Sequence, residues 1–197
     1  MEVLPAQWED VTHPVLLRPD GSSIKYVKRE EVHSLLEACT KERDRLIVLT
    51  LWNTGVRVSE MLQLTPSSYN FSEPSVTIKT LKKRNTYFRT IPLNPEYSGM
   101  VASYCMSMGF KMDLKIFPLS RIRVFQILQD LGSRAGIPGD LCHPHAFRHG
   151  FAVNAVLSGV PPLVLRRWLG HSKIDTTLIY TEVLAKDTRE YIKNMRF

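Results

Sequence analysis

Residues 43–55, RDRLIVLTLWNTG, limit the possible folds more than any other stretch of this sequence. The segment is strongly apolar over several helical turns and ends at Gly55, a residue type that commonly closes helices. A helix that is apolar around most of its surface must be buried by other elements. The sequence therefore predicts that several helices pack around this one.

The remaining segments supply those helices and one small sheet. Helical periodicity or helix-end signals occur over residues 28–42, 56–65, 94–110, 119–139, 145–160, 161–171 and 185–197. Residues 75–93 instead alternate like two strands, with Val76 and Ile78 on the first and Phe88 and Ile91 on the second, around a Lys/Arg/Asn turn. Residues 1–27 are expected to be irregular, with a short strand or arm at most. We expect a mainly α fold with a small antiparallel β-sheet, of the α+β class.

Composition limits the kinds of partner and the cellular compartments that we expect for this protein. A chain of 197 residues with 44% apolar content can bury one good core, and its net charge of +7 favours an anionic polymer as partner. The sequence has neither a signal peptide nor an apolar run of the ~18–20 residues that span a bilayer. Cys39, Cys105 and Cys142 are an odd set without a CxxC pair, which indicates reduced thiols. We expect a cytoplasmic protein with no membrane partner.

Residues 142–150, CHPHAFRHG, concentrate groups that carry chemistry, and three interpretations are open. Cys142, His143, His145 and His149 are all possible zinc ligands. His145 and Arg148 are three residues apart and could act together on a phosphate from one helical face. The segment could also be the basic start of a helix on a nucleic-acid-binding surface.

Two further stretches carry charged or nucleophilic groups at unusual places. Arg57 opens a predicted helix directly after the apolar one, and Glu60 lies three residues on, in reach of a salt bridge. On that fragment alone, a purely structural ion pair is the simpler interpretation. His171 follows Arg148 by 23 residues, and Tyr180 follows His171 by 9.

These stretches together resemble the tyrosine recombinase (phage integrase) family. The strings TGVRVSE, PHAFRHGFA and LGHSKIDTTLIYT carry the resemblance, which extends from about Lys28 to Tyr191. It implies the tyrosine recombinase catalytic-domain fold and a site-specific DNA recombinase that works without metal or cofactor. The alternatives are a type IB topoisomerase-like activity and a catalytically silent DNA-binding regulator, with a zinc hydrolase as the outsider.

The resemblance also implies a role for each matching residue. Arg57 and Arg148 would grip the scissile phosphate, and Glu60 would orient the first of these arginines. Tyr180 is the nucleophile, and His171 is the second histidine. His145 is the histidine of the family's His-x-x-Arg pair and could accept the proton of Tyr180. In this interpretation His149 is a packed helix histidine, and Tyr191 belongs to a core or interface.

The family's general acid is a lysine at the turn of a β-hairpin, and this sequence offers Lys79, Lys82 and Lys83. The family's usual offset falls on Lys82, and Lys83 is the next candidate because this hairpin is a little longer than in common family members. The lysines that do not serve as the acid, with Arg84, are expected to bind DNA phosphates. Residues 120–126 resemble the start of the family's helix that enters the major groove, where arginine and glutamine could read base edges. Its candidate DNA-binding residues are Ser120, Arg121, Arg123 and Gln126. Phosphate contacts alone from a solvated basic face are an equally good interpretation.

Most members of the family carry a separate N-terminal helical domain, whereas only residues 1–27 precede the match here. We expect residues 1–27 to be an arm or linker remnant and residues 28–197 to be the catalytic domain, of a naturally minimal enzyme or of a fragment. The expected partners are double-stranded DNA with a specific site, further copies of the chain and accessory DNA-bending proteins. The tail, residues 185–197, is expected to be exchanged between copies in dimers to tetramers. The target sequence and the outcome of recombination stay open.

Overall fold

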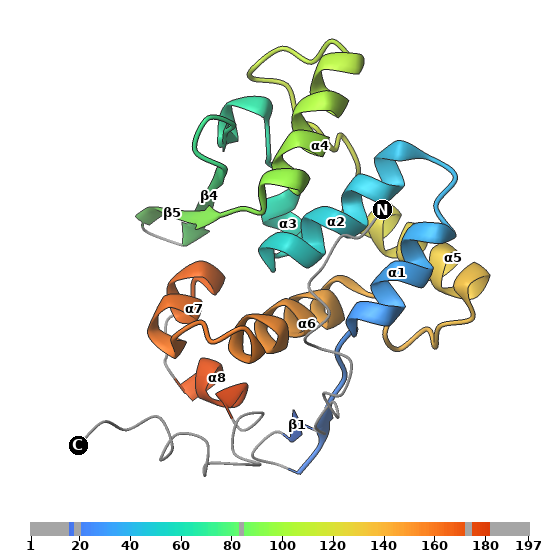
Figure 1. Cartoon of the computed structure of the whole chain (residues 1–197), viewed down its shortest axis with the longest axis vertical. Coiled ribbons are helices and arrows are strands. Elements are labelled where there is room, and N and C mark those ends of the chain that lie inside the picture. The colour runs from blue at the N-terminus through green and yellow to red at the C-terminus, as the bar shows by residue number, and fades with distance from the viewer. Residues whose placement is uncertain (1–15, 18–20, 83–84, 172–174, 182–197) are drawn as a thin grey trace.

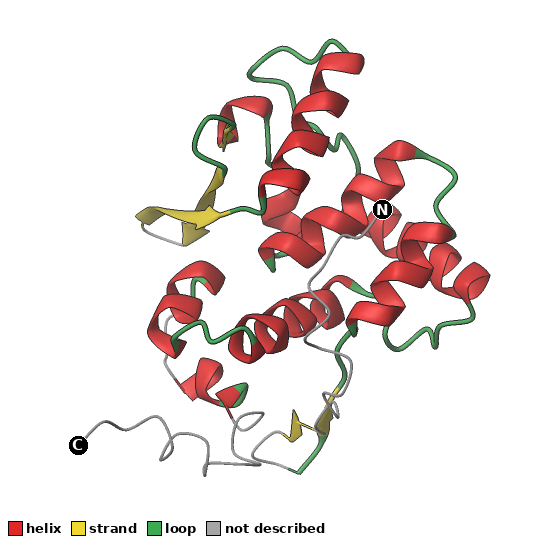
Figure 2. Ribbon diagram, in the orientation of Figure 1, coloured by secondary structure: helices red, strands yellow, loops and turns green. Residues whose placement is uncertain are grey.

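A computed structural model describes residues 16–17, 21–82, 85–171 and 175–181, without the side chains of residues 81, 82, 85, 175 and 176. The helices are α1 (Arg29–Glu37), α2 (Glu42–Thr54), α3 (Val58–Met61), α4 (Pro95–Ser107), α5 (Arg121–Ala135), α6 (Pro144–Leu157), α7 (Pro162–Leu169) and α8 (Asp175–Leu178). A 3₁₀ turn spans Pro66–Ser68. The strands are β1 (Leu16–Leu17), β2 (Ser23–Ile24), β3 (Tyr69–Asn70), β4 (Ser75–Lys82) and β5 (Asn85–Pro92). The prediction of a mainly α fold with a small antiparallel sheet is confirmed (Figure 2).

Helix ends follow the local signals in the sequence. Gly55 closes α2 with a left-handed φ of 58°, and Gly136 closes α5 with a φ of 68°. At the start of α5 the hydroxyl of Ser120 accepts a hydrogen bond from the backbone N–H of Arg123 at 3.1 Å. The predicted helix over residues 28–42 is in fact interrupted, because α1 ends at Glu37 and α2 begins at Glu42 with its own acidic first turn.

The sheet has the order β3–β4–β5, and both pairings are antiparallel. In the β4–β5 hairpin Val76 pairs with Ile91 and Ile78 pairs with Arg89, and Val76, Ile78 and Ile91 are fully buried. Phe88 is 66% exposed, so it does not share a face with Ile91 as its grouping in the sequence suggested. Residues three apart in a strand point to opposite faces, which places Arg89 on the inner face instead.

Helix α6 runs between two apolar clusters, across the middle of the molecule (Figure 1). Ala146 and Phe147, in its first turns, pack into the large cluster with α1–α5 and the three-stranded sheet. Its later residues, from Phe151 on, pack with α7, β1, β2 and Tyr180 in the second cluster. Arg148 lies on α6 where the two clusters meet, and the hairpin β4–β5 lies above α7 at the edge of the molecule.

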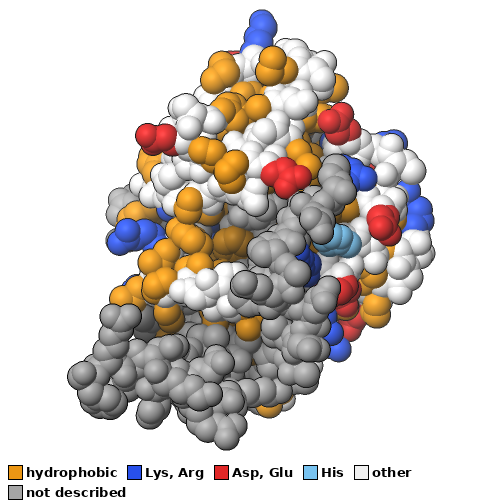
Figure 3. All heavy atoms as spheres, in the orientation of Figure 1, with side chains coloured by type: hydrophobic (Ala, Val, Ile, Leu, Met, Phe, Trp, Pro, Cys, Tyr) orange, Lys and Arg blue, Asp and Glu red, His pale blue; other side chains and the backbone are white. Residues whose placement is uncertain are grey.

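Apolar side chains also reach the surface. Met100, Met106 and Met108 of the α4 region are at least 40% exposed, and Figure 3 shows hydrophobic side chains gathering over this helix. Apolar side chains make up a large part of the surface of folded proteins, so this exposure alone does not indicate a binding site. Within the described ranges, none of the helices has the length and the apolar character that a membrane span requires.

Candidate active site

Arg148 is the most buried cation of the site, with an exposed fraction of 5%. Its Nη1 donates to the carbonyl of Gly55 at 2.7 Å, and its Nη2 donates to the carbonyl of Leu169 at 2.7 Å. These carbonyls end α2 and α7, where helices leave acceptors unsatisfied and favour positive charge. A guanidinium has five N–H donors, so these two bonds fix its plane and leave donors for an anion.

Glu60 and Arg89 form a buried ion pair beside Arg148. Arg89, on β5, donates from Nη1 to Oε1 of Glu60 at 3.0 Å and from Nη2 to Oε2 at 2.8 Å. Its Nε donates to the carbonyl of Trp168 at 2.7 Å, near the end of α7. The hydroxyl of Thr80 on β4 donates to the same carboxylate at 2.8 Å. This network ties the hairpin to α3 and α7.

Arg57 is held more loosely than Arg89. Its backbone N–H donates to Oε2 of Glu60 at 2.9 Å, but its Nη1 lies 3.4 Å from Oε1 and its side chain is 39% exposed. Burial acts to raise the pKa of Glu60, yet the hydrogen bonds and charge of Arg89 and the bonds from Arg57 and Thr80 lower this pKa to about 2. The carboxylate of Glu60 therefore stays ionised between Arg57 and Arg89. The Arg57 side chain remains partly exposed to solvent.

Arg57, Arg89, Glu60 and Tyr180 all lie close enough to Arg148 to affect its pKa. Burial, followed by the charge of Arg57, lowers the pKa of Arg148 to about 10, although Glu60 and Tyr180 act to raise it. The guanidinium is still protonated at neutral pH. The resemblance grouped Arg57, Arg148 and Tyr180, and in the structure Arg57 and Tyr180 both lie close enough to act on Arg148.

His145 and His171, the two histidines to which the family resemblance gives a role, differ in exposure. His145 is exposed one turn before Arg148, and partial desolvation followed by the charges of His143, Arg148 and Arg57 lowers its pKa. Burial, followed by Arg148 and Arg57, lowers the pKa of His171 to about 4. His171 is therefore neutral at physiological pH.

Tyr180 is buried, with an exposed fraction of 1%, and follows the short helix α8. Its hydroxyl lies 2.6 Å from Nδ1 of His149, and the two rings are tilted by 47° with their centroids 5.8 Å apart. Nδ1 of His171 lies 3.0 Å from the hydroxyl of Thr177. A histidine outside the expected set thus contacts the expected nucleophile.

Sequence reasoning missed Arg89, and it gave His149 only a packing role. Strict alternation backward from the buried Ile91 would have placed Arg89 on the inner face of the hairpin. His149 follows His145 by four residues, which places both on one helical face, and that spacing could have grouped them.

The possible zinc ligands do not converge. Cys142 is fully buried, His143 accepts a hydrogen bond from the backbone N–H of Ala146, and His145 is exposed. Across the described part of the chain, no three His, Cys, Asp or Glu side chains are grouped as metal ligands.

The expected DNA-binding residues lie on two elements. Lys79 is exposed on β4, next to Thr80, whereas the side chain of Lys82 and the residues Lys83 and Arg84 lie outside the described part of the structure. Ser120 caps α5, and the exposed side chains of Arg121, Arg123 and Gln126 follow in its first two turns. Tyr191 and residues 185–197 also lie outside the described residues.

A small hollow of about 160 Å³ opens beside the ion pair, between the hairpin and α7. Thr80, Arg89 and His171 line it together with the exposed aromatic side chains of Tyr87 and Phe88. Thr80 and Arg89, which both bind the Glu60 carboxylate, face this hollow.

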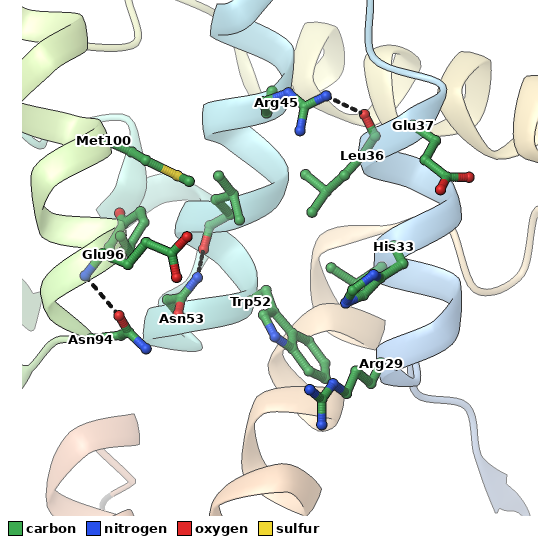
Figure 4. Close-up of a pocket in the computed structure, with 13 residues that line it drawn as sticks. Arg29, His33, Leu36, Glu37, Arg45, Trp52, Asn53, Asn94, Glu96 and Met100 are labelled. Atoms are coloured by element: carbon green, nitrogen blue, oxygen red, sulfur yellow. Dashed lines mark hydrogen bonds between the residues drawn. The ribbon is translucent and has the colours of Figure 1, made fainter. Parts of the chain in front are cut away.

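A larger hollow of about 550 Å³ lies between α1, α2 and α4 (Figure 4). Arg29, His33 and Trp52 border it on one side, and Glu96 and Met100 of α4 border it on the other (Figure 4). None of the residues that line it belongs to the group around Arg148.

Comparisons with known proteins by family profile, by sequence and by structure agree with one another. The sequence profile of the phage integrase family matches residues 25–187. Tyrosine recombinase XerA of Pyrococcus furiosus is 33% identical over 182 residues, which cover 86% of this chain and 61% of the relative. The chain spans less than two thirds of the length of the curated XerA relatives that it matches.

Solved structures share the fold. The crystal structure of XerA recombinase superposes with a TM-score of 0.69 at 26% identity, over 88% of this chain and 66% of that one. The XerH site-specific recombinase, solved bound to its difH substrate before cleavage, superposes with a TM-score of 0.67 at 19% identity, over 91% of this chain and 58% of that one.

Proposed function

The chain belongs to the phage integrase family, and from that premise we propose that it is a site-specific DNA recombinase. In this proposal it breaks and rejoins DNA strands through a covalent 3′-phosphotyrosyl intermediate on Tyr180. The observation that carries the proposal is the buried Arg148, which the Gly55 and Leu169 carbonyls hold in place close enough to Arg57, Glu60 and Tyr180 to interact with them.

The arginines act on the phosphate. A phosphodiester under attack gains negative charge on its non-bridging oxygens, and guanidinium groups can donate two parallel hydrogen bonds to such oxygens. Arg148 is held in one plane by the Gly55 and Leu169 carbonyls, so its remaining donors need no reorganisation during the reaction. Arg57, which is partly exposed, supplies the second clamp.

The histidines of the expected set assist at the same phosphate. His171 is neutral because its pKa is lowered to about 4, so it can donate a hydrogen bond without adding another positive charge beside the arginines. His145 lies on the same helix as Arg148, one turn nearer its start, and is open to the substrate.

Tyr180 supplies the nucleophile. A phenol has a pKa of about 10, so only about one in a thousand is ionised at neutral pH, and activation must offset roughly 4 kcal/mol. Attack of the phenolate on phosphorus would form a tyrosyl ester and release a 5′ hydroxyl. The ester stores the backbone bond, so the strand can be rejoined without an external energy source.

Lys82 is our proposed general acid for the departing 5′ oxygen. Support comes from its place at the end of β4, next to the hairpin turn. Lys79 is less suited, because its neighbour Thr80 faces Glu60 and adjacent strand residues point to opposite faces. A substrate with a 5′-bridging sulfur, whose thiolate leaves without a proton, should restore cleavage to a Lys82→Ala variant. A variant of Lys79 rescued in its place would reassign the acid.

Partners and domain organisation belong to the same proposal. Residues 28–197 would form the catalytic domain, and residues 1–27 an arm or linker. Double-stranded DNA would contact the basic first turns of α5 through Arg121, Arg123 and Gln126. Two to four copies would act together on paired sites, with the tail exchanged between them and accessory DNA-bending proteins assisting.

Covalent trapping tests this function. Nicked duplexes that tile the source replicon are incubated with wild-type and Tyr180→Phe protein in EDTA, denatured in detergent and separated by electrophoresis. A protein–DNA band with wild type only, on one tile, is the expected result and delivers the target site. Bands on every tile would favour topoisomerase-like activity, and no band on any tile, with DNA binding retained, would favour the silent regulator.

A further inference from the structure

His149 is the imidazole that contacts the Tyr180 hydroxyl, at 2.6 Å from Nδ1. It follows Arg148 directly on α6 and is half-buried, so its ring is held by the helix and by the second apolar cluster around Tyr180. His145, assigned to proton transfer by the resemblance, lies one turn away and is exposed.

From this contact we propose that His149 is the catalytic base that takes the phenol proton of Tyr180. The inference rests on the proposed function and adds a residue to it. In the tautomer that carries its proton on Nε2, His149 presents the Nδ1 lone pair to the phenol.

The proton can be followed through the step. It passes from the Tyr180 hydroxyl to Nδ1 of His149, and an imidazolium forms. The phenolate oxygen bonds to phosphorus while the bond from phosphorus to the 5′ oxygen breaks, and that oxygen takes its proton from the general acid. In the reverse step the 5′ hydroxyl attacks, and the imidazolium returns its proton to Tyr180.

The surroundings suit this exchange. Tyr180 is buried among apolar side chains, where water cannot readily accept the proton, so a fixed neighbouring group is needed. Arg148 lies near enough for an ionised Tyr180 to interact with its charge, and that attraction stabilises the phenolate once it forms.

The other histidines are placed less well for this proton. His171 directs Nδ1 to the Thr177 hydroxyl at 3.0 Å. The Tyr180 hydroxyl lies within hydrogen-bonding distance of Nδ1 of His149, so His149 is already placed to take its proton.

A variant can keep the hydrogen bond and remove the basicity. In His149→Asn the amide can occupy the place of Nδ1 and accept from the phenol, but it cannot hold the proton. We expect single-turnover cleavage of the trapped nicked duplex to slow by about 10²–10⁴-fold, with DNA affinity unchanged within about twofold. The acid limb of the pH–rate profile that belongs to the imidazole should disappear.

A more acidic nucleophile separates a lost base from a structural defect. With 3,5-difluorotyrosine at position 180, introduced by nonsense suppression, the phenol ionises at lower pH and depends less on a base. We expect this substitution to recover at least about tenfold of the rate lost in His149→Asn. His145→Asn, the matched control on the same helical face, should gain little.

Other outcomes overturn the inference. Cleavage by His149→Asn within about threefold of wild type would show that the contact only packs the ring. Loss of rate without rescue by difluorotyrosine, in protein whose melting temperature matches wild type, would make His149 structural. Rescue of His145→Asn instead would give the base to His145. If wild type forms no covalent product while binding DNA, the proposed function itself fails, and this inference fails with it.

Discussion

Replacing Glu60 by glutamine tests whether one buried carboxylate organises the cations of the site. Glu60 accepts two hydrogen bonds from Arg89, one from Thr80 and the backbone N–H of Arg57. Glutamine keeps the size of the side chain but removes the negative charge. Arg89, whose side chain is only 8% exposed, would then keep its own charge without a carboxylate partner.

The size of the effect follows from the pKa of Glu60. A pKa lowered from 4.5 to about 2 means that the preference for the ionised carboxylate over the neutral one is roughly 3 kcal/mol stronger in the folded protein than in the unfolded chain. We expect Glu60→Gln to lower the free energy of unfolding by about that amount. In a chain of this size, such a loss lowers the melting temperature by roughly 6–12 °C.

The assay is equilibrium unfolding in urea, followed by circular dichroism, at several pH values. The folded-state pKa of Glu60 is lowered, so its contribution is complete above its unfolded pKa of 4.5 and disappears as the pH falls toward 2. The difference in stability between wild type and Glu60→Gln should therefore be constant at neutral pH and shrink below pH 4.5.

Glu73→Gln is the matched control, because Glu73 is exposed and its change should alter stability by less than about 0.5 kcal/mol. If the free energy of unfolding of Glu60→Gln lay within about 1 kcal/mol of the wild-type value, the buried ion pair would contribute no net stability, contrary to this prediction. A difference that grew as the pH fell below 4.5 would equally contradict it.

Three other changes have defined outcomes. Arg148→Lys should slow cleavage of trapped DNA by about 10²–10³-fold in single-turnover assays, because lysine cannot bridge both carbonyls and bind phosphate. Gly150→Ala should cost about 1–3 kcal/mol or more in urea unfolding, because the added Cβ would overlap the Val27 carbonyl oxygen, whereas Gly99→Ala, with no atom nearby, should stabilise α4 by about 0.5–1 kcal/mol. DNA affinity measured against salt should fall with a log–log slope of roughly −3 if Arg57 and Arg148 together neutralise the scissile phosphate and two arginines of α5 neutralise one phosphate each, and a slope near zero would contradict the proposed contacts.

Local signals in the sequence predicted the elements of the fold well. Gly55 and Gly136 end their helices because glycine adopts the left-handed conformation at no steric cost, and Ser120 begins α5 because its hydroxyl caps the first turn. Short elements were missed. Helix α8 and strand β3 have four and two residues, too few for a periodic pattern to be visible.

The site could be predicted only in part. The resemblance to the family indicated Arg57, Arg148 and Tyr180, but not what holds them. Arg148 is fixed by carbonyls 93 and 21 residues away, and no local pattern encodes contacts at that separation. Arg89 was missed because the inner face of β5 is decided by pairing with β4, and a count that begins at Phe88 has the wrong parity.

The central claim is that Tyr180 attacks DNA, and identifying the modified residue tests it most directly. Wild-type protein is trapped on the nicked duplex, digested with protease and nuclease, and analysed by tandem mass spectrometry for a peptide that carries a nucleotide. We expect a nucleotide joined through its 3′ phosphate to Tyr180. A nucleotide on Tyr191 or on a histidine, or one joined through a 5′ phosphate, would contradict it.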